Sequence, residues 1–102
     1  MSNWIEVGPL EAIPQLGARV VESNGEEIVI FRTAEDHLFA LRNRCPHKNG
    51  PLSEGMVHGN QVACPLHNWN IDLQSGEAVA PDKGCVRRYE VKLQGETILL
   101  AI

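Results

Sequence analysis

CPHKNGPLSEGMVHGNQVACPLH, residues 45–67, is the stretch that decides the fold. It begins with Cys45-Pro46-His47 and ends with Cys64-Pro65-Leu66-His67. The two motifs are therefore C-x-H and C-x-x-H, and sixteen residues separate them. Each motif supplies one thiolate and one imidazole, and both groups are common metal ligands in proteins. We therefore predict two loops that together hold a metal centre.

Two kinds of metal centre use two cysteines and two histidines. A tetrahedral zinc ion does so, but zinc-finger spacings usually pair Cys with Cys and His with His. Mixed half-sites suit a [2Fe–2S] cluster of the Rieske type, in which two histidines replace two cysteines on one iron. We predict such a cluster, with each loop placing its cysteine on one iron and its histidine on the other. A zinc-stapled binding module is a remote alternative. The predicted ligands are Cys45, His47, Cys64 and His67.

The residues between the two motifs predict a tight turn. Gly59-Asn60 separates the short segments 56–57 and 61–63, and glycine next to asparagine is typical of a hairpin. A hairpin at this place would bring the two loops side by side.

The rest of the chain also predicts short strands. Asn24-Gly25 lies between the mostly apolar segment 18–21 and the apolar run 28–31, which is a strong hairpin signal because both central residues accept positive φ. Residues 38–41 and 97–101 are expected to be further strands, and residues 88–93 alternate between polar and apolar as one half-buried strand does. Six prolines interrupt the possible helices. We expect a single all-β domain, residues 1–102, made of several small antiparallel sheets.

Composition and charge restrict the classes of partner. The chain has 102 residues and a net charge of −4, which argues against nucleic acid or an anionic membrane surface. Its longest apolar runs, 28–31 and 98–102, are far too short to span a bilayer. The first residues resemble no signal peptide, and three cysteines cannot all pair in internal disulfides. We expect a cytoplasmic protein with no membrane and no nucleic-acid partner.

The two motifs together resemble the ligand motif of the Rieske ferredoxin family, and the resemblance extends over the whole chain. It implies the Rieske fold, in which small antiparallel sheets are stacked and the cluster is held between two loops at one tip. High-potential members of the family carry an extra cysteine in each loop. At these positions the chain has Gly50 and Leu66. We therefore expect a midpoint in the lower half of the Rieske range of about −150 to +300 mV.

A finer resemblance concerns the residues around the ligands. CPHKNGPLSEG at 45–55 and CPLHNW at 64–69, with Gly84-Cys85-Val86 downstream, are similar to the small subunit of assimilatory NAD(P)H-dependent nitrite reductase. That resemblance implies an electron-transfer subunit whose large partner carries flavin and sirohaem and reduces nitrite to ammonium. The chain lacks a G-x-G-x-x-G nucleotide motif, so it holds no complete active site. The alternative is a Rieske ferredoxin that delivers electrons to a ring-hydroxylating dioxygenase.

Four residues outside the motifs have two possible roles each. Cys85 could be a redox switch or a fifth ligand, but we expect a buried structural thiol, since free cysteine packs as a small hydrophobe. His37 and His58 have no cysteine at ligand spacing, so we expect surface or hydrogen-bonding roles. Trp69 either packs in the core or contacts the cluster or a partner.

Overall fold

Three small antiparallel sheets form the described part of the computed structural model, which covers residues 4–23, 25–44, 51–64, 69–79 and 84–101. The first sheet has the order β1 (Trp4–Pro9), β10 (Thr97–Ala101), β9 (Val91–Gln94). The second has the order β2 (Ala18–Ser23), β3 (Glu26–Arg32), β4 (Leu38–Arg42), β8 (Arg88–Tyr89). The third has the order β5 (Met56–His58), β6 (Gln61–Ala63), β7 (Asn70–Asp72). Two single-turn 3-10 helices are η1 (Leu10–Ala12) and η2 (Leu52–Glu54).

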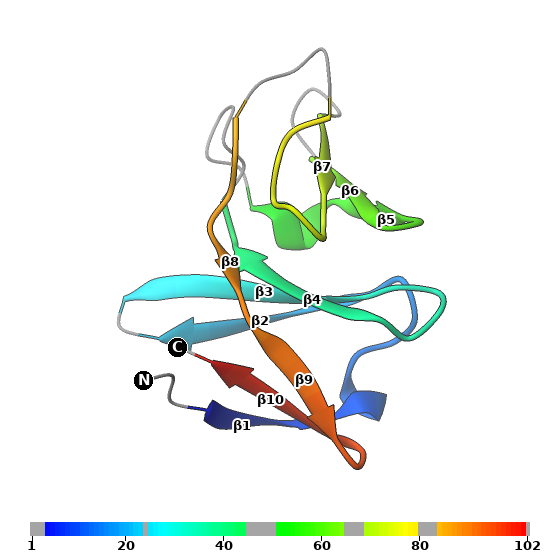
Figure 1. The fold of residues 1–102 in the computed structure, drawn as a ribbon, viewed down its shortest axis with the longest axis vertical. Helices are drawn as coiled ribbons and strands as arrows, with labels where there is room; N and C mark the ends of the chain where they lie inside the picture. Colours follow the sequence, from blue (N-terminus) through cyan, green and yellow to red (C-terminus); the bar gives the residue numbers. More distant parts are fainter. Residues whose placement is uncertain (1–3, 24, 45–50, 65–68, 80–83, 102) are drawn as a thin grey trace.

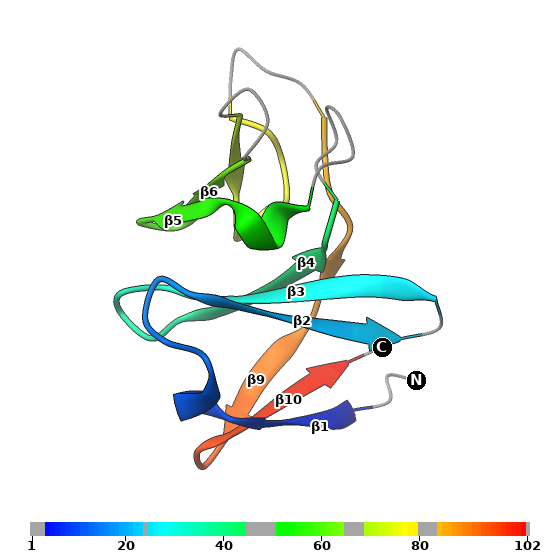
Figure 2. The ribbon, with the colours of Figure 1, turned by 180° about the vertical axis from the view of Figure 1, so that it is seen from behind.

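The sheets are stacked along the long axis of the molecule, with the second sheet between the other two (Figure 1). The view from behind shows η2, the short green coil, between the second and third sheets (Figure 2). The all-β prediction is confirmed, and so is the expectation of small antiparallel sheets. Within the described ranges no helix is long and apolar enough to cross a membrane.

The predicted hairpins are confirmed. β2 pairs with β3 around Gly25, and β5 pairs with β6 around Gly59. The φ angles of these glycines are 79° and 56°, in the left-handed region that glycine occupies at little cost. At the other end of the chain, β1 and β10 are paired with Trp4 opposite Ala101. The two described ends of the chain therefore lie next to each other in the first sheet.

One predicted strand is wrong in extent. Residues 88–93 belong to two strands in two sheets, because the chain leaves the second sheet after Tyr89 and enters the first sheet at Val91. Between them, the Glu90 carbonyl accepts a hydrogen bond from the Ala101 amide, 2.9 Å. Leu93 is 39% exposed, so the predicted burial of alternate residues ends there. Strands β1 and β7 were not expected from the sequence.

The core has two parts that meet at β3. Ile28 and Ile30 point to one side of β3 and join a cluster with residues of the first sheet, while Val29 and Phe31 point to the other side and join a cluster with the third sheet. All four are at most 1% exposed. Successive side chains of a strand point to opposite faces, so a strand covered on both faces needs a continuous apolar run. Burying each such side chain contributes roughly 1.5–3 kcal/mol.

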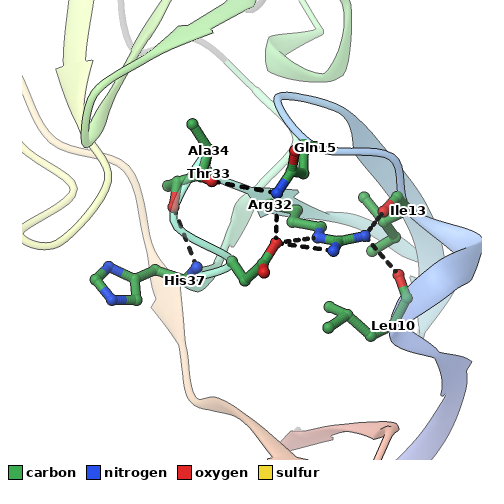
Figure 3. A network of polar contacts seen from close by, with 8 residues as sticks. Leu10, Ile13, Gln15, Arg32, Thr33, Ala34 and His37 are labelled. Atoms are coloured by element: carbon green, nitrogen blue, oxygen red, sulfur yellow. Dashed lines mark hydrogen bonds and ion pairs between the residues drawn. The ribbon is translucent and has the colours of Figure 1, made fainter.

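Arg32, at the end of β3, ties the segment that follows β1 to the second sheet (Figure 3). Its Nη1 donates to the carbonyls of Leu10, 3.3 Å, and Ile13, 2.7 Å. Its Nε donates to Asp36 Oδ1, 2.9 Å, which also accepts from Gln15, 3.1 Å. The hydrogen bonds from Gln15 and then Arg32 hold the pKa of Asp36 below its usual value. This network fixes how the first two sheets pack on each other.

We expect Arg32→Met to lower the free energy of unfolding by about 2 kcal/mol, because the Leu10 and Ile13 carbonyls lose a charged donor in a partly buried place. Arg32→Lys should recover only part of the loss, since an ammonium lacks the planar fork. Denaturant unfolding followed by circular dichroism measures both variants. Wild-type stability in the methionine variant would contradict this assignment.

Candidate iron–sulfur centre

Cys64 is the one predicted ligand that lies in the described residues. It directly follows β6, is fully buried, and belongs to the apolar cluster between the second and third sheets. Its amide donates to the Trp69 carbonyl, 2.6 Å. Cys45, His47 and His67 lie outside the described residues, as do Lys48, Gly50 and Leu66. In the described part of the chain no three His, Cys, Asp or Glu side chains are grouped as a metal site.

Three segments of the chain, two of them carrying the ligand motifs, each begin and end at residues that are joined by a hydrogen bond; we call these flanking residues, with their immediate neighbours, the base of the segment. The first segment lies between Asn43 and Ser53, and the Ser53 amide donates to Asn43 Oδ1, 2.7 Å. The second is closed by Cys64 and Trp69, and the third by the Ala78 amide and the Gly84 carbonyl, 2.9 Å. Residues from the bases of all three segments pack in or against one apolar cluster: Leu52, Cys64, Trp69 and Ala78. The structure therefore brings the flanks of the two motifs together.

The third sheet positions Cys64. Ala63, the residue before it, pairs with Met56 on one side and Asn70 on the other. Gly55 precedes this hairpin, and a Cβ at Gly55 would collide with the Ala63 carbonyl oxygen. The Gly55 amide donates to the Leu52 carbonyl, 2.9 Å, which closes η2. Because glycine is required for this close approach, η2 and β6 stay in contact just before the second motif.

Charged residues surround the base of the first motif-bearing segment. The Tyr89 hydroxyl donates to Glu26 Oε2, 2.8 Å, and Arg42 lies 4.0 Å from the same carboxylate. The hydrogen bond from Tyr89, followed by the nearby arginines, lowers the pKa of Glu26, while burial and then this hydrogen bond raise the pKa of Tyr89. A surface pocket of about 300 Å³ lies here, lined by Glu22, Gly25, Glu26, Glu27, Arg42, Asn43 and Arg44.

The structure also shows where the four residues outside the ligand motifs lie. Cys85 is exposed, which corrects the prediction of a buried thiol: its neighbour Val86 takes the inward position, so Cys85 points outward. His58 Nε2 is 2.8 Å from Asn70 Oδ1, which confirms a hydrogen-bonding role, and His37 is exposed. Trp69 is partly buried against the cluster that contains Cys64.

Sequence reasoning missed Asn43. Its side chain is almost buried and holds Ser53 from ten residues away. The only signal in the sequence is its position two residues before Cys45. No local pattern identifies its partners, since these contacts form only in the folded chain.

The stacked sheets, the buried Cys64 thiol and the two motifs define a class of iron–sulfur protein. The family model of the Rieske [2Fe-2S] domain matches residues 3–90. The chain belongs to the Rieske [2Fe–2S] family, whose domain binds its cluster through Cys and His and transfers electrons.

Several relatives and solved structures match this chain along nearly the whole length of both proteins. The ferredoxin component of the naphthalene 1,2-dioxygenase/salicylate 5-hydroxylase systems of a Ralstonia species is 31% identical, over 96% of this chain and 94% of that protein. The ferredoxin of carbazole 1,9a-dioxygenase from Nocardioides aromaticivorans IC177 has a TM-score of 0.87 at 27% identity, covering 97% of both chains. A proposed NADH-dependent nitrite reductase small subunit from Mycobacterium tuberculosis has a TM-score of 0.91, covering 100% of this chain and 96% of that one. Its 17% identity shows a shared fold alone.

The residues present fit a Rieske cluster. A thiol that is fully buried among apolar side chains suits the cysteine side of such a centre, where an apolar shell keeps water away. The sequence adds a second cysteine and two histidines at the spacing of the family motif.

Tyr89→Phe should change how stability depends on pH. The Tyr89 hydrogen bond lowers the pKa of Glu26 below 4.5 in the folded state. The stabilisation from this hydrogen bond is therefore fully present above pH 4.5, and it is lost as the pH falls through the lowered pKa. We expect the phenylalanine variant to be less stable than wild type at pH 7, with the gap closing as the pH falls through the lowered pKa of Glu26. Thermal unfolding at a series of pH values measures this. In a Glu26→Gln background the same tyrosine substitution should show no such convergence, and a constant gap in the wild-type background would refute the assignment.

Proposed function

We propose that this chain is a ferredoxin that carries single electrons to a ring-hydroxylating oxygenase. The observation that supports this most is the 31% identity to an oxygenase-system ferredoxin component along nearly the full length of both proteins. An anthranilate 1,2-dioxygenase ferredoxin subunit from Burkholderia cepacia is also 31% identical, over 91% of this chain. A Rieske domain whose sequence has no nucleotide motif suits a carrier that works between a reductase and a terminal enzyme.

In this proposal the cluster is held by Cys45, His47, Cys64 and His67. The burial of Cys64, and the convergence of the segment bases on one apolar cluster, support this ligand set. The chain's own contribution is to hold two thiolates and two imidazoles in place and to exclude water from the thiolate side. The bound cluster supplies reversible one-electron transfer. Residues 1–102 would act as one domain, and we propose the cytoplasm as its compartment.

A second candidate is the small subunit of NAD(P)H nitrite reductase, with a large flavin and sirohaem subunit as partner. The residues that favour it are CPHKNGPLSEG at 45–55, CPLHNW at 64–69, and Gly84-Cys85-Val86. The low midpoint expected from Gly50 and Leu66 suits both candidates, because each would receive electrons that originate from NAD(P)H. The two candidates differ only in the protein that accepts the electron.

Replacing any one of the four proposed ligands should abolish the cluster. We expect Cys45→Ala, His47→Ala, Cys64→Ala and His67→Ala to lose the two irons, the labile sulfide and the red-brown absorption. Iron and sulfide analysis of anaerobically purified protein measures this. Cys85→Ala is the matched control, since Cys85 is an exposed cysteine outside the motifs and should keep both irons. A motif variant that keeps a normal cluster removes that residue from the ligand set.

Electron delivery distinguishes the two partners. The chemically reduced protein is mixed, as sole electron donor, with either the ring-hydroxylating oxygenase or the sirohaem subunit of its source organism. We expect cis-dihydroxylated or monohydroxylated product from the oxygenase, in proportion to the ferredoxin added, and no ammonium from nitrite. Ammonium formation that depends on this chain, with no product from the oxygenase, would favour the second candidate.

A further inference from the structure

Asn43 is an unusual side chain in the described part of the molecule. Among those residues only Thr33 and Asn43 are buried and polar, with 2% and 9% of their surface exposed. Asn43 directly follows β4, which ends at Arg42. A buried carboxamide is costly unless its hydrogen bonds are made, so its contacts should have a purpose in the fold.

The Asn43 carboxamide makes three hydrogen bonds. Its Oδ1 accepts from the Ser53 amide, 2.7 Å, and its Nδ2 donates to Ser53 Oγ, 3.1 Å, and to Glu27 Oε1, 3.2 Å. The Asn43 amide also donates to the Glu27 carbonyl, 2.8 Å. The Ser53 backbone amide can only donate, so the carboxamide oxygen of Asn43 must face it and the carboxamide has a single possible orientation.

These contacts add hydrogen bonds between two elements that also meet in the apolar cluster. Glu27 belongs to β3, and Ser53 belongs to η2, which packs between the second and third sheets. Leu52, next to Ser53, is fully buried in the cluster that contains Cys64. The Asn43 side chain therefore fixes the two flanks of residues 44–52 to each other and to the body that carries Cys64.

We propose that Asn43 is a positioning residue for the cluster, which sets where the first ligand pair lies relative to Cys64. This inference rests on the proposed ligands Cys45 and His47, which lie between Asn43 and Ser53 in sequence. The potential and spectrum of an iron–sulfur centre depend on ligand geometry, hydrogen bonding and solvent access. Loosening the Asn43 contacts should therefore alter the cluster's electronic properties, and not only the stability of the protein.

The test compares Asn43→Ala with Thr33→Val in the full-length, cluster-containing protein. Thr33 is the matched control: its buried Oγ1 accepts a hydrogen bond from the His37 amide, 3.1 Å, at the opposite end of the β3–β4 pair. We expect both variants to melt at a lower temperature than wild type. Only Asn43→Ala should shift the reduction midpoint and the g values of the reduced cluster, and lose iron to a chelator about tenfold faster, as a loss of roughly 1.4 kcal/mol implies.

A swapped pair gives a second, independent test. Asn43→Asp keeps the acceptor for the Ser53 amide but places a carboxylate against Glu27, so it should perturb the g values and the chelation rate. Adding Glu27→Gln restores one donor and one acceptor across this contact with the wild-type net charge, so the double variant should recover both properties. Recovery supports the proposal even if Asn43→Ala does not fold.

Wild-type midpoint, g values and chelation rate in the Asn43 variants would overturn the inference, as would a Thr33→Val variant that changes them equally. Failure of the swapped pair to recover either property would also overturn it. The ligand proposal is tested separately: loss of the cluster in Cys45→Ala together with a wild-type signature in Asn43→Ala would remove this inference and leave the ligands in place.

Discussion

The burial of β3 on both faces is the constraint on which the rest of the structure depends. Ile28 and Ile30 pack toward the first sheet while Val29 and Phe31 pack toward the third, so one strand connects the two halves of the core. A polar residue at any of these four positions would leave an unpartnered group in one half or the other. Arg32, at the end of the same strand, adds a polar tie to the segment after β1. The third sheet, and with it Cys64, is thereby held on a rigid support.

The described bases of the candidate centre rest on this support. Residues from the bases of three segments pack in or against the apolar cluster that contains Cys64, and each segment is closed by a hydrogen bond between its flanks. Functional side chains on loops are well placed only when the elements beneath them are rigid. Here this rigidity comes from apolar packing, and the hydrogen bonds between Asn43 and Ser53 hold the two flanks of the first motif at a fixed separation.

Much of the fold could be predicted from the sequence because its signals are local. Gly25 and Gly59 indicated two hairpins, and the apolar run 28–31 indicated one strand of the first hairpin, although not that both of its faces are buried. The prediction for Cys85 was wrong, because which of Cys85 and Val86 points inward is set by pairing across the chain. The change of sheet at Glu90 likewise depends on partners far away in sequence. The two ligand motifs could be read directly, whereas the contacts of Asn43 with Glu27 and Ser53 exist only after folding.

The pairing of Trp4 with Ala101 has a consequence for the architecture of longer proteins. Both described ends leave from one edge strand pair in the first sheet, which the second sheet separates from the third (Figure 1). A polypeptide joined to either end would therefore start from the first sheet, with the second sheet between it and the sheet next to Cys64. Such a unit can be inserted into, or fused to, a larger chain without a connection at the end that carries Cys64.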